Sequence, residues 1–287
     1  MHRYSGKDWS NADIDRIRGI IANNPTAKRA KLAQLVCASF DWNSINGQPK
    51  LMSCRVAMIR MHEQGLIQLP EPRQKPGRRT CRQFSSPASD PQPEINCPIG
   101  ELSDLCVELV TPGTTLALWN EYISRYHYLG YKTMPGAQLR YLIYARGQVL
   151  GAMGYSAAAW KVAPRDKFIG WTPEKRVAKL HLIVNQTRFL ILPWVHCKNL
   201  ATRTLSLVAR RIGDDWQSRY GYRPVLMETF VDDARFRGTC YKAGNWQHVG
   251  LTQGRTKFDR YHVGGAPVKS IWLMPLRRDF RRHLLAD

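Results

Sequence analysis

The sequence predicts a protein of the α/β (α+β) class, in which a small helical N-terminal domain precedes a larger domain built on a mixed sheet. Three patterns predict this division. Apolar side chains between residues 11 and 70 recur every three or four positions, as on the buried face of a helix. Residues 138–156 form two strand-like runs around the turn at Arg146-Gly147, as in a hairpin. Residues 181–233 pass from strand to helix to strand, the order of an α/β core.

Composition excludes several classes of protein. The 287 residues are 44% hydrophobic and 10% aromatic, which indicates a globular protein with a sizeable core. No run of about eighteen apolar residues occurs, so we expect no membrane span. The N-terminus lacks the apolar segment of a secretory signal, and the seven cysteines are scattered without a CxxC pair. We therefore expect reduced thiols and a cytoplasmic location.

Charge is the strongest global signal in the sequence. Lysine and arginine number 43 against 22 acidic residues, which gives a net charge of +21 and a pI near 10.0. Residues 99–287 hold 28 basic and 14 acidic side chains, so the excess belongs to the body of the protein rather than to one tail. A polyanion is the natural partner of such a surface, and we expect that partner to be DNA.

Residues 1–70 are predicted to form a winged-helix-like DNA-binding domain. Their apolar spacing predicts three short helices, and the segment Leu66–Leu69 follows as a wing-like strand. Arg55 and Arg60 lie on the third helix and are candidates for phosphate contacts. The alternative is a packing or protein-contact module with the same three helices.

The remainder of the chain is predicted to be a linker followed by a second domain. Residues 71–98 are rich in Pro, Ser and Arg and show little periodicity, which is typical of a linker. Residues 99–287 then form the α/β domain. Aromatic and charged side chains gather outside its apolar runs, at residues 126–131 and 165–171. They are candidates to line a cleft, although each aromatic ring could equally belong to the core or its rim.

Acidic residues cluster at the end of the last core strand. Glu228 and Asp232 close this strand, and Asp166 comes from an earlier loop. If the topology brings the three together, they could hold Mg²⁺ or Mn²⁺ for phosphodiester cleavage, with Glu228 and Asp232 as the metal ligands. The alternative is that these acids form structural ion pairs with nearby arginines, as is common in a strongly basic protein.

Tyr241 is the candidate nucleophile for a second route to strand cleavage. A tyrosine that attacks a phosphate needs basic neighbours to stabilise the developing charge. Tyr241 has such neighbours in the sequence, namely Arg237, Lys242, Asn245 and His248. Tyr126 and Tyr128, which flank His127, are the second choices. The alternative is a buried tyrosine whose hydroxyl makes one structural hydrogen bond.

Basic and amide side chains throughout the chain are candidates for contacts with nucleic acid. Some lie among apolar runs, some in a glycine-containing loop after the last strand, and some in a C-terminal stripe. The candidates are Arg55, Arg60, Arg188, Arg237, Asn245, Arg255, Arg277, Arg278, Arg281 and Arg282. A solvated basic face is the alternative for the C-terminal stripe.

Long motifs in the sequence resemble the DruA family, a domain family of unknown function named for a component of the Druantia anti-phage defence system. The resemblance covers nearly the whole chain, including the N-terminal domain and its ending at Arg55–Pro70. Its motifs are YHYLGY, RDKFIGW, NQTRFLILPWVHCKNLATRTL, ETFVD and RFRGTCYKAGNWQHVGLTQGR. The resemblance implies DNA-related work in phage defence or in mobile elements, without implying a particular reaction.

The second domain also has a fainter resemblance to the N-acetyltransferase-like (GNAT) fold. A hairpin, a strand, a helix and a strand precede the run GTCYKAGNWQHVG, which is similar to a region of the phage DNA-modification protein Mom. In the GNAT family, a glycine-rich turn before the central helix presents backbone N–H groups to the pyrophosphate of acetyl-CoA. Here residues 195–201 contain no glycine, so the sequence argues against acetyl-CoA as a cofactor.

Together these patterns predict a DNA-binding protein of the DruA type that processes DNA. Strand cleavage or transfer through Glu228, Asp232 and Tyr241 is the first hypothesis. The second is a GNAT-like acyltransferase that modifies a nucleobase or a protein. The third is a non-catalytic DNA-sensing module that acts with other proteins of a defence system or mobile element.

Overall fold

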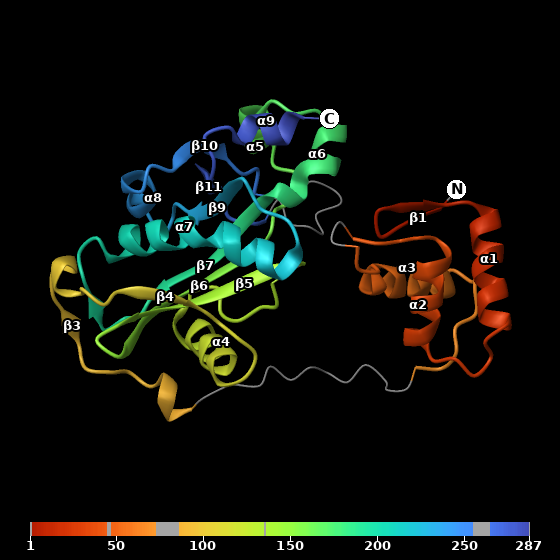
Figure 1. The fold of residues 1–287 in the computed structure, drawn as a ribbon, viewed down its shortest axis with the longest axis horizontal. Helices are drawn as coiled ribbons and strands as arrows, with labels where there is room; N and C mark the ends of the chain where they lie inside the picture. The colour runs from red at the N-terminus through yellow and green to blue at the C-terminus, as the bar shows by residue number, and fades with distance from the viewer. Residues whose placement is uncertain (1, 45–46, 73–85, 135, 255–264, 287) are drawn as a thin grey trace. The chain divides into compact units, whose positions relative to one another are not determined.

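The computed structural model describes residues 2–44, 47–72, 86–134, 136–254 and 265–286 (Figure 1). Contacts between residues divide the chain into two compact units, Met1–Cys81 and Arg82–Asp287. No helix in the described ranges is both long enough and apolar enough to cross a bilayer.

The first unit is a three-helix bundle with a hairpin in front of it. Strands β1 (His2–Tyr4) and β2 (Lys7–Trp9) pair antiparallel. Helix α1 begins where Ser10 and Asp13 cap each other reciprocally, which satisfies backbone donors of the first turn. The three helices have the bounds α1 (Asn11–Ala22), α2 (Arg29–Ser39) and α3 (Leu51–Glu63).

The structure differs from the prediction of a wing at Leu66–Leu69. In the described part of the chain this segment pairs with no strand. Ile67 and Leu69 are instead buried in the helical core, because two apolar side chains at alternate positions can anchor an extended segment without a partner strand. The three helices are where the spacing predicts them, whereas the winged-helix assignment stays a prediction.

The second unit is built on a seven-stranded mixed sheet, which confirms the predicted fold class. The strand order is β10-β11-β9-β7-β6-β5-β4, and within this sheet only β7 and β9 pair in parallel. The strands are β4 (Cys106–Leu109), β5 (Gln138–Ala145), β6 (Gln148–Ala157), β7 (Ile183–Ile191), β9 (Leu226–Asp232), β10 (Gln247–Leu251) and β11 (Lys269–Pro275).

Two long helices cover the sheet on opposite faces (Figure 1). Helix α4 (Thr114–Tyr126) packs on one face and contacts β5, β6 and β7. Helix α7 (Leu200–Tyr220) connects β7 to β9 and covers the other face with a buried stripe that includes Val208, Ile212 and Trp216. The shorter helices are α5 (Ala163–Ile169), α6 (Pro173–Lys179), α8 (Thr239–Ala243) and α9 (Phe280–Leu285).

Residues 86–98, which the sequence assigns to the linker, pack on the second unit. Ser86 donates two hydrogen bonds to Glu121 of α4, and Ser89 accepts one from Arg125. Strand β3 (Ile95–Asn96) pairs in parallel with β8 (Val195–His196), just before α7. The sequence gives no sign of this packing. The contacts are side-chain hydrogen bonds and one short strand, and neither produces a periodic apolar pattern.

Strands β7 and β9 diverge halfway along their length. Their pairing ends at Gln186 and Thr229, whereas β7 continues to Ile191 with only β6 beside it. The register between β6 and β7 contains one extra residue, Thr187, at the same point, and a bulge of this kind bends a strand. The edge of β7 that faces β9 is therefore unpaired over residues 187–191.

Candidate functional site

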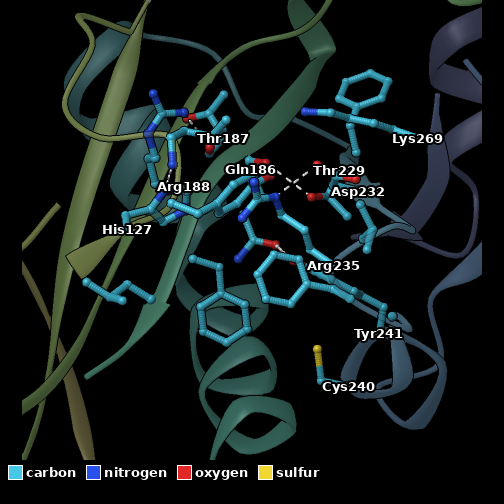
Figure 2. A pocket seen from close by; sticks show the side chains of 18 of the residues that line it. His127, Gln186, Thr187, Arg188, Thr229, Asp232, Arg235, Cys240, Tyr241 and Lys269 are labelled. Carbon is cyan, nitrogen blue, oxygen red and sulfur yellow. Dashed lines mark hydrogen bonds and ion pairs between the residues drawn. The ribbon is translucent and has the colours of Figure 1, made fainter. Parts of the chain in front are cut away.

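A cavity of about 780 Å³ opens where β7 and β9 diverge (Figure 2). Its walls come from the second half of β7, the end of β9, the segment after α4, the residues around the start of α8, and the first residue of β11. The cavity thus lies at the carboxyl ends of the one parallel pair in this sheet. Sites at the carboxyl ends of parallel strands, where the sheet separates, are the usual ligand sites of open α/β folds.

Arg188 lies in the wall formed by β7 and is only 9% exposed. Its Nη1 donates to the carbonyl of Thr187 at 2.7 Å, and its Nε has no hydrogen-bond partner. It makes no ion pair with any residue in the described part of the chain. Burial accordingly lowers the pKa of the guanidinium, because the charge loses its hydration without gaining a counter-ion. An unpaired buried cation of this kind indicates a site for an anion or for hydrogen-bond acceptors.

His127 ends helix α4 beside Arg188 and is also buried. Its Nδ1 accepts a hydrogen bond from the backbone N–H of Leu129 at 3.2 Å. Burial, together with the nearby charges of Arg188 and Lys269, lowers the pKa of His127 to about 4. The ring is therefore neutral at neutral pH and carries its proton on Nε2. His127 is a hydrogen-bond donor through that atom, and its other nitrogen is already engaged.

Four basic side chains and a single carboxylate line the described part of the cavity. The basic residues are Arg188, Arg235, Arg237 and Lys269, and the carboxylate is Asp232, which is 6% exposed. Asp232 accepts from the backbone N–H of Ala234 at 3.3 Å and lies 3.7 Å from Arg235 Nε. The excess of positive charge favours a ligand that carries negative charge.

Aromatic rings stand among the residues of this cavity. Tyr128 and Phe236 meet edge to face with their ring centres 5.3 Å apart, and both are partly exposed. The guanidinium of Arg235 lies 5.3 Å from the centre of the Tyr128 ring. Exposed aromatic faces next to arginine are typical of surfaces that stack nucleobases.

Tyr241, the predicted nucleophile, lies in a buried hydrogen-bond network. Tyr241 lines the cavity but is only 7% exposed, and its hydroxyl donates to Oε1 of Gln186 at 3.0 Å. The amide of Gln186 in turn donates to the hydroxyl of Tyr155 at 3.3 Å. Burial raises the pKa of Tyr241, which works against the ionised form that a nucleophile needs. This geometry supports the structural alternative of a bonded tyrosine.

Glu228 and Asp166 both contact a buried arginine. Arg165 is fully buried, and its Nη1 donates to Glu228 at 2.8 Å while its Nη2 donates to Asp166 at 2.8 Å. The backbone N–H of Ala159 donates to the other oxygen of Glu228 at 2.8 Å. The expected convergence with Asp232 does not occur, because Asp232 faces the cavity and the other two acids are neutralised by Arg165. Among the described residues, no group of three potential ligands is arranged to hold a metal ion.

The predicted nucleic-acid contacts are dispersed over the molecule. Arg188 and Arg237 line the cavity, and Arg55 and Arg60 are exposed on α3 of the first unit. Asn245 and Arg277 instead line a separate groove beside α7.

The C-terminal arginines do not form the uniform stripe that the sequence suggests. Arg277 forms an ion pair with Asp279, and Arg281 lies over the rings of Phe168 and Phe280. Arg278 and Arg282 are exposed, whereas Arg255 lies outside the described residues.

Sequence reasoning missed several residues that shape the cavity. Lys269 is far along the chain from the other residues that line the cavity. Phe236 and Gln186 carry no charge that would identify them as candidates in the sequence. No periodic pattern signals these three residues, because strand pairing rather than chain order brings them together.

A family model described as Druantia protein DruA matches residues 60–266 of the chain. The chain belongs to the DruA family. The match spans six of the seven strands of the large sheet, all except β11, and every residue that lines the cavity except Lys269.

The other comparisons give distant likenesses. Among curated proteins no match was found. Among solved structures, the chain is similar to aminoglycoside acetyltransferase AAC(6')-Ib in complex with coenzyme A, with 15% identity, a TM-score of 0.40, and coverage of 62% of this chain and 98% of that one. It is also similar to an N-acetyltransferase from Staphylococcus aureus Mu50, with 13% identity, a TM-score of 0.37, and coverage of 61% and 100%.

Proposed function

We propose that this member of the DruA family is a transferase that binds an acyl thioester of coenzyme A between β7 and β9 and modifies an acceptor on nucleic acid. The observation that carries the proposal is the unpaired edge of β7 inside a positively charged cavity. Backbone N–H and C=O groups that lack a strand partner need hydrogen bonds from elsewhere. An extended amide-bearing chain, such as the pantetheine arm of coenzyme A, can supply them as an added strand does.

The turn before α7 also fits such a ligand better than the sequence suggests. Asn199 precedes the helix with φ 68, the left-handed conformation that glycine would otherwise provide and that asparagine tolerates. Its side chain makes no cap hydrogen bond, and although the N–H of Leu200 donates to the carbonyl of Cys197, the next two N–H groups of the first turn remain for a ligand. Helix N-termini with free donors bind phosphate groups. Asn199 thus supplies without glycine the backbone conformation that a pyrophosphate-binding turn needs.

The residues of the cavity have distinct parts in this reaction. A bound thioester supplies an activated acyl group, and the acceptor nitrogen must lose a proton as it is acylated. Asp232 is the carboxylate of the described lining that can accept this proton. His127 cannot do so through Nδ1, which already accepts the N–H of Leu129. His127 and Arg188 act as hydrogen-bond donors that position the acceptor.

Nucleic acid is the proposed acceptor because of charge and aromatic content. The chain carries a net charge of +21, and the lining of the cavity is itself basic. Tyr128, Phe236 and Arg235 offer stacking surfaces suited to bases. Arg55 and Arg60 of α3 are solvent-exposed and available for phosphates. Membership of the DruA family supports a role for this activity in Druantia anti-phage defence.

Strand cleavage is less well supported than transfer. It requires two accessible carboxylates or a reactive tyrosine. Glu228 is held by Arg165 and Ala159, and the hydroxyl of Tyr241 is held by Gln186.

A charge placed at the start of α7 tests the proposed donor site. Ala201→Asp adds a carboxylate to the first turn, which favours the helix through its dipole but repels a pyrophosphate. We expect coenzyme A to raise the melting temperature of the wild-type protein and not that of Ala201→Asp. Gln217→Glu adds the same charge near the other end of α7 and serves as the matched control. A wild-type protein without any shift at millimolar coenzyme A would contradict the proposal.

A further inference from the structure

Two donor side chains and the carboxylate of the described lining lie on different walls of the cavity. Figure 2 shows Arg188 and His127 on one side of the cavity and Asp232 on the other. On the first wall, the guanidinium of Arg188 and Nε2 of the neutral His127 ring are both donors. The second wall presents a carboxylate, which at neutral pH only accepts. A ligand that fits must carry acceptors along one edge and N–H groups along the next.

Guanine has this arrangement among the nucleobases. Its O6 and N7 are neighbouring acceptors that match the fork of an arginine, and its N1–H and N2–H₂ are neighbouring donors that match a carboxylate. Adenine places its N6–H₂ group beside N7, so an amino donor would face the donors of Arg188 and His127. We infer that the acceptor side of the cavity holds a guanine base that has left its stack, read by Arg188 and His127 on one edge and by Asp232 on the other.

The environment of Arg188 explains why a base should occupy this position. The guanidinium uses one of its five N–H groups, on the carbonyl of Thr187, and has no counter-ion in the described part of the chain. The cavity passes directly in front of it, since Thr187 to Ile191 all belong to the lining. Gly154, the cross-strand neighbour of Arg188, allows close packing here: a Cβ there would lie 2.9 Å from the ring of Trp119 and 3.2 Å from Cβ of Arg188. The guanidinium of Arg188 therefore lies at the wall of the cavity with most of its N–H groups unbonded.

The aromatic residues indicate how the base is held once it leaves the duplex or strand. Tyr128 stacks on His127 with ring centres 4.9 Å apart and touches Phe236 at 5.3 Å. A flipped base must replace the stacking that it loses, and aromatic side chains at the edge of a pocket supply it. Arg235, Arg237 and Lys269 are then close enough to the cavity to contact the adjoining phosphates. This inference rests on the proposed function for the acceptor side and names its base.

The test uses short DNA probes with one base flanked by abasic positions, so that phosphates are constant and only the base changes. Binding is measured by fluorescence anisotropy at low salt. We expect guanine to bind at least about tenfold more tightly than adenine, the size of effect that one bidentate contact gives. The 7-deazaguanine probe lacks the N7 acceptor and should lose most of that preference. Equal binding of guanine and adenine, or no binding of any probe, overturns the inference.

Variants locate the preference within the cavity. Arg188→Met removes the guanidinium and should lower the affinity for the guanine probe to that for the adenine probe. Arg237→Met removes a cation of the lining that does not contact the base. It should therefore weaken the binding of both probes equally and leave the ratio of their affinities unchanged. A wild-type ratio in Arg188→Met overturns the inference. The probe series on the wild-type protein decides the same question if Arg188→Met does not fold.

The base preference and the proposed thioester site fail separately. Coenzyme A binding is read from the melting temperature without any oligonucleotide, whereas the preference is read without coenzyme A. A protein that is stabilised by coenzyme A but does not distinguish guanine from adenine retains the proposed transferase and loses the guanine site. A protein that prefers guanine but is not stabilised by coenzyme A retains the guanine site and loses the proposed thioester site.

Discussion

Arg165 and Arg188 are both buried beside the parallel strands β7 and β9, and they differ in what surrounds the charge. Arg165 contacts two carboxylates and the carbonyl of Ala159, each at 2.8 Å, and lies against the ring of Trp171. Arg188 has one hydrogen bond, to a neighbouring carbonyl, and no carboxylate within the described structure. A buried charge with complete partners holds the fold together, whereas a buried charge without them is retained at a cost that a ligand can offset.

The positions of the two arginines along the strands match this difference. Glu228, the partner of Arg165, lies opposite Asn185 within the paired part of β7 and β9. Arg188 lies beyond the last pair, where the strands diverge and the cavity begins. Ion pairs can pack tightly where the sheet is continuous. Where it opens, the same side chain faces a space that another molecule can enter.

Removal of the paired arginine should have the largest effect on stability. Arg165→Met leaves Glu228 buried without a counter-ion, whereas Asp166 keeps Arg176 at 3.2 Å, and we expect the free energy of unfolding to fall by about 3–5 kcal/mol. Urea unfolding followed by tryptophan fluorescence measures this loss. Glu228→Gln in the same background should recover part of this loss, because it removes the carboxylate that has no counter-ion. A loss below about 1 kcal/mol, which is typical of surface ion pairs, would contradict this role of Arg165.

His127 should make stability depend on pH on the Arg188 side of the comparison. Its pKa is about 4 in the folded protein against an ordinary 6.5, so between these values the unfolded chain binds more protons. Stability therefore rises from pH 4 to pH 6.5, and its contribution is complete above that range. We expect His127→Asn, whose side-chain oxygen can still accept the N–H of Leu129, to lessen the difference in unfolding free energy between pH 7 and pH 5. An unchanged difference would mean that His127 is not held neutral by its surroundings.

The comparison also shows what the sequence could and could not predict. The three N-terminal helices, the hairpin of β5 and β6, and the succession of β7, α7 and β9 follow from local periodicity and agree with the structure. The roles of Glu228 and Arg188 do not, because each depends on residues that strand pairing brings near. Arg165 is 63 positions from Glu228, so no local pattern links the two. The sequence identified Glu228 and Arg188 as candidates, but it could not show which acidic residues form ion pairs in the folded protein.

Exposed arginines provide a third case, in which partners matter little for stability. Arg55 and Arg60 lie in solvent on α3, so their replacement by alanine should leave the unfolding free energy within about 0.5 kcal/mol of the wild-type value. The proposal of DNA binding predicts that the double variant binds DNA more weakly and that its dependence of log affinity on log salt loses about two units of slope. Lys31→Ala, an exposed basic residue of α2, is the control. An unchanged slope would remove α3 from the DNA-binding surface.

Paired melting curves of the wild-type protein and Arg188→Met test most directly whether the unpaired arginine is kept for a ligand. Each protein is melted alone and with the guanine probe. Because Arg188→Met removes an unsatisfied buried charge, we predict a melting temperature about 2–4 °C higher without ligand and a smaller shift than that of the wild-type protein when the probe is added. A lower melting temperature in Arg188→Met, together with a probe-induced shift as large as that of the wild-type protein, would contradict the account.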